Sequence, residues 1–193
     1  MIPLILIIKY MHNRLDGIFV YLSGPIDHAS DDGKGWRQKF IELINNHNIK
    51  INIIDPTNKP KICNSENRDF KSYNMQLRAE GKFKELKDIV SQFRHEDLRF
   101  VDLSDLIITY IDADIHMCGS YDELFTAERQ KKPRMAIIKG GLKKSPLWLF
   151  DVFELEDMFE SVEECVDKLL KIHNGQHPLD SRWILIRKHF LQG

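Results

Sequence analysis

The stretch DLIITYID, from Asp105 to Asp112, constrains the fold more than any other part of the sequence. Its apolar residues are consecutive, so a strand formed here is apolar on both of its faces. Strands of this kind lie between two layers of helices, an arrangement typical of parallel sheets. A second such run, GIFVYLSGP from Gly17 to Pro25, stops at a Gly-Pro turn signal.

Segments with helical spacing alternate with these strands along the chain. The predicted strands cover residues 17–25, 49–56, 105–112, 134–141 and 181–190. The predicted helices cover residues 35–47, 83–105, 120–133, 145–153 and 158–175. The polar stretch from Thr57 to Lys82 is predicted to be a long loop, and such loops often bind ligands.

This alternation predicts an α/β fold: a flavodoxin-like, doubly wound parallel sheet in three α/β/α layers, with strand order of about 2-1-3-4-5. Residues 17–193 form one domain, and residues 1–16 are expected to be an extension outside it. Sheets of this type bind ligands where the strand order reverses. The order therefore brings residues 21–25 and 112–123 around one crevice.

Composition narrows the classes of function. The formal net charge is -1, which gives no support to binding of a nucleic acid polymer through bulk charge. The apolar run IPLILII near the N-terminus is far shorter than the roughly 20 residues that span a bilayer, so no membrane partner is expected. Three scattered cysteines make no disulfide framework, which favours a reduced, cytoplasmic setting.

Carboxylates dominate the polar residues that the predicted fold delivers to the crevice. The sequence GPIDHASDDGKGWR after the first strand matches neither the dinucleotide-binding nor the P-loop pattern. The histidines show no paired metal-ligand spacing. We therefore expect no cofactor and no metal.

Glu123 has two interpretations from spacing alone. With Ser120 it forms Ser-x-x-Glu, the pattern of a helix capping box. Alternatively, a carboxylate in the first turn of a helix is kept ionised by the helix dipole, and at a crevice it is a candidate nucleophile. Spacing alone does not decide between them.

Three segments, VYLSGPI, DLRFVDLSDLIITYID and CGSYDELFTAERQKKP, resemble the nucleoside 2-deoxyribosyltransferase family and its relatives that hydrolyse N-glycosidic bonds. The resemblance covers about Gly17 to His173 and has the three motifs in the family's order. It implies an enzyme without cofactors that acts on a small-molecule nucleoside or nucleotide. It also implies a homodimer or higher homo-oligomer, to which the apolar segment PLWLFDVF is a plausible contributor.

The resemblance assigns roles to individual residues. Glu123 matches the nucleophile that attacks the anomeric carbon, Asp97 matches a pocket aspartate, and Tyr21 matches a tyrosine that holds the nucleophile. These three are the candidate catalytic residues. The candidate substrate-binding residues are Ser23, Gly24, Asp55, Trp36, Asp114, Gly119 and Ser120.

One departure from the family pattern concerns the outcome of the reaction. Met117 stands six residues before Glu123, where many transferases have an aspartate that moves a proton to and from the base. Asp114, His116 or Asp97 would have to take over that role. Transfer of the sugar to a second base and hydrolysis by water both stay open. The alternative is a non-catalytic nucleotide-binding or sensor module on the same fold.

Overall fold

A five-stranded parallel sheet forms the centre of the computed structural model, which describes residues 13–59, 68–177 and 181–184. The strands are β1 (Phe19–Ser23), β2 (Asn52–Ile54), β3 (Leu106–Ile111), β4 (Arg134–Ile138) and β5 (Met158–Phe159). Their order is β2-β1-β3-β4-β5, and every neighbouring pair is parallel. The predicted α/β fold class and the predicted strand order are confirmed.

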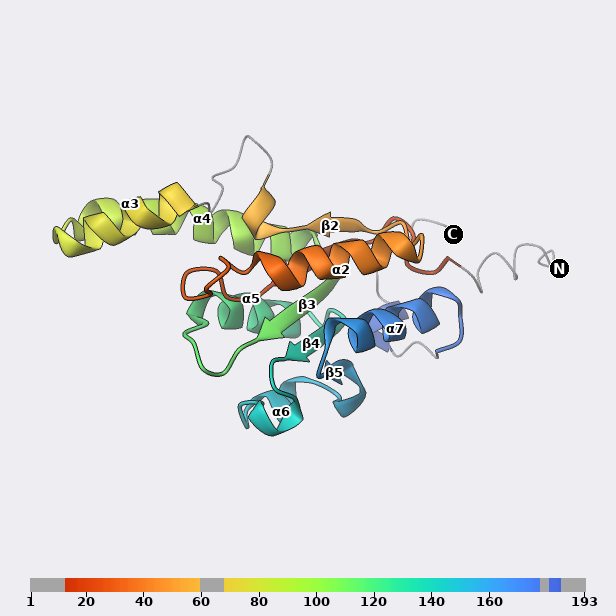
Figure 1. Cartoon of the computed structure of the whole chain (residues 1–193). Helices are drawn as coiled ribbons and strands as arrows, with labels where there is room; N and C mark the ends of the chain where they lie inside the picture. The colour runs from red at the N-terminus through yellow and green to blue at the C-terminus, as the bar shows by residue number, and fades with distance from the viewer. Residues whose placement is uncertain (1–12, 60–67, 178–180, 185–193) are drawn as a thin grey trace.

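Helices cover both faces of the sheet (Figure 1). The long helices are α2 (Lys34–Asn46), α3 (Arg68–Ala79), α4 (Phe83–Leu103), α5 (Cys118–Arg129) and α7 (Val162–His173). The short helices and 3-10 turns are η1 (Pro56–Asn58), η2 (Leu142–Lys144), α6 (Leu149–Val152), η3 (Leu155–Asp157) and α8 (Ser181–Ile184). The α2 and α7 helices pack on one face around Val20 and Leu22, whereas α4 and α5 pack on the other around Tyr21. Adjacent side chains of β1 therefore pack against opposite helical layers.

Two parts of the predicted element map are wrong. The segment expected to be one long loop contains α3, although its residues 60–67 lie outside the described part of the chain. Residues 181–184, expected to begin the last strand, form α8. The fifth strand is instead Met158–Phe159, which the sequence pattern placed at the start of a helix. That helix begins after Ser161, whose side chain accepts a hydrogen bond from the N–H of Glu164.

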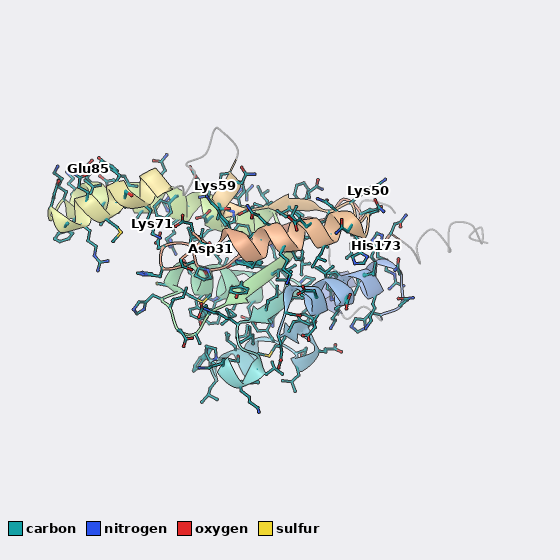
Figure 2. The ribbon with its side chains drawn as sticks, viewed as in Figure 1. Asp31, Lys50, Lys59, Lys71, Glu85 and His173 are labelled. Atoms are coloured by element: carbon teal, nitrogen blue, oxygen red, sulfur yellow. The ribbon has the colours of Figure 1, made fainter. Side chains whose placement is uncertain are left out.

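The α3 helix and the first part of α4 project together beyond the end of the sheet (Figure 1). We call these residues, 68–93, the α3–α4 arm; Glu85 lies near its far end (Figure 2). Apolar spacing along α4 predicted a buried face that included Phe83, but this side chain is 66% exposed. The buried residues of α4 are Asp97 and Val101, where the helix has reached the sheet.

The packed domain begins before Gly17. Leu15 is buried in the core, and the backbone N–H of Arg14 donates to the carbonyl of His173. Residues 13–16 of the expected extension therefore pack against the domain, and residues 1–12 lie outside the described part. Across residues 13–59, 68–177 and 181–184, no helix is long and apolar enough to cross a bilayer.

Candidate functional site

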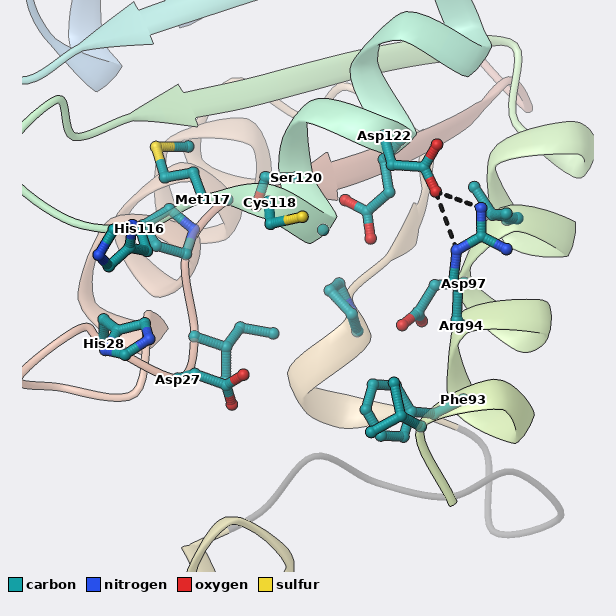
Figure 3. Close-up of a pocket in the computed structure, with 18 residues that line it drawn as sticks. Asp27, His28, Phe93, Arg94, Asp97, His116, Met117, Cys118, Ser120 and Asp122 are labelled. Atoms are coloured by element: carbon teal, nitrogen blue, oxygen red, sulfur yellow. Dashed lines mark hydrogen bonds and ion pairs between the residues drawn. The ribbon is translucent and has the colours of Figure 1, made fainter. Parts of the chain in front are cut away.

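A cleft of about 570 Å³ lies beyond the C-terminal ends of β1 and β3, at the predicted switch point (Figure 3). Four segments line it: the loop after β1, Pro56 of η1, the middle of α4, and the start of α5 with the loop before it. Figure 3 shows Phe93, Arg94 and Asp97 on one side and His28 and His116 on the other. Glu123 also belongs to the lining.

Both oxygens of the Glu123 carboxylate accept hydrogen bonds from β1. The Tyr21 hydroxyl donates to Oε1 at 2.9 Å, and Ser23 Oγ donates to Oε2 at 2.6 Å. Tyr21 and Ser23 are both 0% exposed and stand two residues apart, so they face the same layer. Donors to both oxygens stabilise the ionised carboxylate and fix its orientation.

The capping-box interpretation of Ser120 and Glu123 is wrong. The α5 helix begins at Cys118, and its N-cap residue, Met117, makes no side-chain capping bond. Ser120 is therefore inside the helix, and Glu123 lies in its second turn rather than its first. The Glu123 side chain instead hydrogen-bonds to residues about 100 positions away in the sequence.

Two ion pairs occupy the α4 side of the cleft. Asp97 Oδ1 lies 2.8 Å from Nζ of Lys59, and the Lys59 side chain is 1% exposed. Arg94 donates through Nε and a terminal nitrogen to Asp122 Oδ2, at 3.0 and 2.6 Å (Figure 3). The Arg94–Asp122 pair joins α4 to α5 beside Glu123.

Behind the loop after β1, close packing leaves little room for a side chain at position 24 and places Trp36 in the core. A Cβ at Gly24 would lie 3.0 Å from the Trp36 ring and 3.2 Å from Cβ of Tyr110. Trp36 stacks on Tyr110 with ring centroids 5.3 Å apart. Burial raises the pKa of the Tyr110 hydroxyl. Trp36 therefore packs behind the cleft and is not part of its lining.

Arg37 braces the same loop from inside the protein. Its guanidinium is 0% exposed and donates to the carbonyls of Leu22, Gly24 and Gly33. Its Nε also lies 3.5 Å from Asp55 Oδ1. One buried cation thus ties the end of β1, the following loop and the end of β2 together.

The structure gathers most of the residues predicted for the site. Glu123, Asp97, Gly24, Gly119 and Ser120 line the cleft, and Tyr21 and Ser23 lie beneath Glu123.

Asp55 and Asp114 lie outside the lining, as Trp36 does. Asp55 accepts from the backbone N–H and the hydroxyl of Thr57, and so caps η1. Asp114 is exposed, and its N–H donates to Asp112.

Several lining residues were not predicted from the sequence. Phe93, Arg94 and Asp97 share a face of α4, since positions three and four apart are neighbours on a helix. That spacing could have identified Phe93 and Arg94. His116, named above as one replacement for the proton-transferring aspartate, lines the cleft with its ring centroid 5.6 Å from that of His28, which comes from another loop and was not predicted. Among the described residues, no group of three or more His, Cys, Asp and Glu side chains is placed to hold a metal ion.

Comparisons of sequence find no relative: no protein-family model and no curated protein matches the chain. Comparisons of structure do find similar folds. A 2-deoxyribosyltransferase from Leishmania mexicana has a TM-score of 0.53 at 15% identity, over 81% of this chain and 99% of that one. A conserved protein from Enterococcus faecalis V583 has a TM-score of 0.51 at 14% identity, over 79% and 99%.

A third structure, the 2-deoxyribosyltransferase of Bacillus psychrosaccharolyticus, has a TM-score of 0.48 at 14% identity, over 87% of this chain and 96% of that one. The two likenesses with TM-scores above 0.5 establish the fold and, at identities this low, the fold alone. The resemblance to deoxyribosyltransferases that the three sequence motifs indicated is therefore confirmed at the level of fold.

Proposed function

We propose that this protein cleaves the N-glycosidic bond of a nucleoside or nucleotide, with Glu123 as the nucleophile. Glu123 attacks C1′ of the sugar and displaces the base, which gives a glycosyl-enzyme. A second base or a water molecule then takes the sugar. The observation that carries this proposal is the Glu123 carboxylate, held between the hydroxyls of Tyr21 and Ser23 in the lining of the cleft.

The electrostatics of the cleft suit such a reaction. Breaking an N-glycosidic bond puts positive charge on the sugar ring as the base departs. The carboxylates of Asp27, Asp97, Asp122 and Glu123 all line the cleft, where they stabilise that charge. The two hydroxyls from β1 hold Glu123 in one orientation before substrate binds, which lowers the entropic part of the barrier.

The same charges favour a neutral nucleoside over a nucleoside 5′-phosphate. Arg94 is the one lysine or arginine among the described lining residues, and it is paired with Asp122. Lys34 and Arg37, the cations that follow the loop after β1, do not belong to the lining, and Arg37 is completely buried. Val90, Phe93 and Leu98 form an apolar part of the wall, against which a base can pack.

Base release from a panel of nucleosides and nucleotides, followed by chromatography, tests the proposal. Glu123→Gln should lower the rate by about 1,000-fold or more, because the covalent nucleophile is lost. Asp122→Asn is the matched control, since it removes a neighbouring carboxylate of the same lining. It should keep the rate within about tenfold, the range of a change in cleft electrostatics.

Full activity in a folded Glu123→Gln protein would contradict the proposal. Binding of a nucleoside or nucleotide without release of base would favour the sensor alternative.

Hydrolysis should compete strongly with transfer to a second base. Met117 is 4% exposed, and its sulfur accepts the N–H of Asp112 at 3.2 Å. A thioether cannot move a proton to and from an acceptor base, whereas a nearby carboxylate can activate water. Exchange of a labelled base in excess acceptor, measured beside hydrolysis, tests this. Efficient exchange by the wild type, unchanged in Met117→Asp, would contradict it.

Self-association is part of the proposal. Leu147, Trp148 and Phe150, in and beside α6, are 88%, 77% and 42% exposed, which is unusual for side chains of this size. We expect a homodimer or higher homo-oligomer in solution, with this segment in the contact. Light scattering measures the molar mass in solution. A monomeric mass for the fully active enzyme would contradict self-association.

A further inference from the structure

Lys59 is a buried cation that pairs with Asp97 from outside the lining of the cleft. Its side chain is 1% exposed, and its Nζ lies 2.8 Å from Asp97 Oδ1 and 3.9 Å from Glu96 Oε2. It also lies 5.9 Å from the centre of the Phe93 ring. Lysine is seldom buried this deeply without a partner, because desolvating an ammonium group is costly.

The end of β2 delivers Lys59 to this position (Figure 2). Lys59 directly follows the η1 turn, which Asp55 caps and which starts with Pro56. Asp55 also lies within 3.5 Å of the buried Arg37 guanidinium. The backbone before Lys59 is therefore fixed to the end of β1 through Arg37, and Pro56 itself lines the cleft.

The α4 helix supplies the partners of Lys59 from one face. Phe93, Glu96 and Asp97 are spaced three and four residues apart, so their side chains lie together on the helix. Phe93 and Asp97 line the cleft, whereas Glu96 is absent from the lining. Of the two carboxylates that pair with Lys59, only Asp97 lines the cleft.

We propose that Lys59 is a positioning residue, which keeps the Asp97 carboxylate ionised and oriented in the cleft. A cation at 2.8 Å favours the charged form of a carboxyl group that is otherwise nearly buried. Asp97 then serves as a hydrogen-bond acceptor and a negative charge beside the substrate. It does not serve as the acid that protonates the leaving base. The role of Asp97 in turnover rests on the proposed function, whereas the effect of Lys59 on Asp97 does not.

Other charged and titratable groups surround Asp97 and Lys59. They come from α4, from α5 with its preceding loop, and from the loop after β1: Arg94, Glu96, His116, Cys118, Asp122, Glu123, Asp27 and His28. Four of these eight groups are carboxylates, which disfavour a further negative charge. The Lys59 cation opposes that effect at Asp97.

Carboxyl NMR tests the pairing without any need for turnover. The Asp97 signal, assigned by its loss in Asp97→Asn, should titrate about one pH unit or more higher in Lys59→Met than in the wild type. Lys59→Gln keeps a hydrogen-bond donor but no charge, so it should give the same shift if Lys59→Met fails to fold. Lys59→Arg should titrate like the wild type. Lys71→Met, which removes an ion pair with Asp32 away from the cleft, should leave Asp97 unchanged.

The pH profile of base release supplies the second readout. The acid limb of kcat/KM should move to higher pH in Lys59→Met, by the same amount as the Asp97 titration, and Lys59→Arg should restore it. A purely structural lysine would lower the melting temperature and leave this limb in place. An unchanged Asp97 titration in folded Lys59→Met or Lys59→Gln protein would overturn the inference. Absence of base release from the wild type would instead overturn the proposed function, while the NMR titration still decides the role of Lys59.

Discussion

Two tyrosine–glutamate hydrogen bonds in this protein have the same chemistry and different surroundings. In the cleft, the hydroxyl of Tyr21, which is 0% exposed, donates to Glu123. In the α3–α4 arm, the hydroxyl of Tyr73, which is 44% exposed, donates to Glu85. The hydrogen bond to Glu85, with a smaller contribution from desolvation, raises the pKa of Tyr73.

The difference lies in what holds each pair. Tyr21 lies in β1, between β2 and β3, and its side chain is completely buried. Ser23 adds a second donor to the same carboxylate. Tyr73 lies on a surface where water competes for both groups. Burial therefore makes the Tyr21 bond a fixed part of the site, whereas the Tyr73 bond is replaceable.

The largest expected effect comes from removing the buried guanidinium of Arg37 behind the cleft. Arg37→Met leaves the carbonyls of Leu22, Gly24 and Gly33 without their donor and Asp55 without its cation. The free energy of unfolding should fall by about 3–5 kcal/mol. Chemical denaturation measures this change.

Arg99→Met is the control for that substitution, since the Arg99 side chain is 67% exposed and pairs with Asp102 on the surface. It should change the free energy of unfolding by less than about 0.5 kcal/mol. Equal losses in the two variants would show that Arg37 does not brace the loop.

The next largest effect is the difference in the rate of base release between Tyr→Phe substitutions in the two tyrosine–glutamate pairs. Tyr21→Phe should lower the rate of base release about 10- to 100-fold, the range for a lost hydrogen bond to a charged group. Tyr73→Phe should leave the rate unchanged, because its hydroxyl bonds to Glu85 in the arm. Steady-state kinetics of both variants beside the wild type measure the contrast, and similar rates for both would contradict it.

The smallest expected effect concerns Asp31, in the loop after β1. Burial alone would raise the pKa of Asp31, but hydrogen bonds from the N–H groups of Gly35, Gly33 and Asp31 itself, together with the charge of Arg37, outweigh it and lower the pKa. The stability from these bonds is present above the unfolded pKa, near pH 4, and is lost as the pH falls through the folded value.

Because Asp31 is largely exposed, Asp31→Asn should lower the free energy of unfolding at neutral pH by less than about 1 kcal/mol. Denaturation at pH 7 and at pH 3 tests this, since the difference between variant and wild type should shrink at the lower pH. A difference that grows at pH 3 would contradict it.

The sheet could be predicted from the sequence because three of its strands are apolar on both faces. The buried runs around Val20, Ile108 and Ile137 are typical of strands in a parallel sheet, and they also locate the switch point. The strand Met158–Phe159 could not be predicted, since two residues form no pattern and their pairing with β4 is decided by tertiary structure. The α3 helix could not be predicted either, because its polar sequence resembles that of a loop.

The site could be predicted in part. The sequence identified Glu123 as a candidate nucleophile, but it also allowed a capping box with Ser120. The Ser-x-x-Glu pattern is compatible with a helix cap and with hydrogen bonds to residues far away in the sequence. Only the packing of α5 against β1 distinguishes them, through Tyr21 and Ser23. Lys59 could not be predicted, since its burial depends on how η1 meets α4.

The central claim is that Glu123 forms a covalent bond to the sugar. A nucleoside with a fluorinated sugar, which slows release of the glycosyl-enzyme, should add the mass of one sugar to each chain. Mass spectrometry after digestion should place that mass on the peptide containing Glu123, and Glu123→Gln should carry none. An adduct on another residue, or release of base from this substrate with no adduct at any time, would contradict the account.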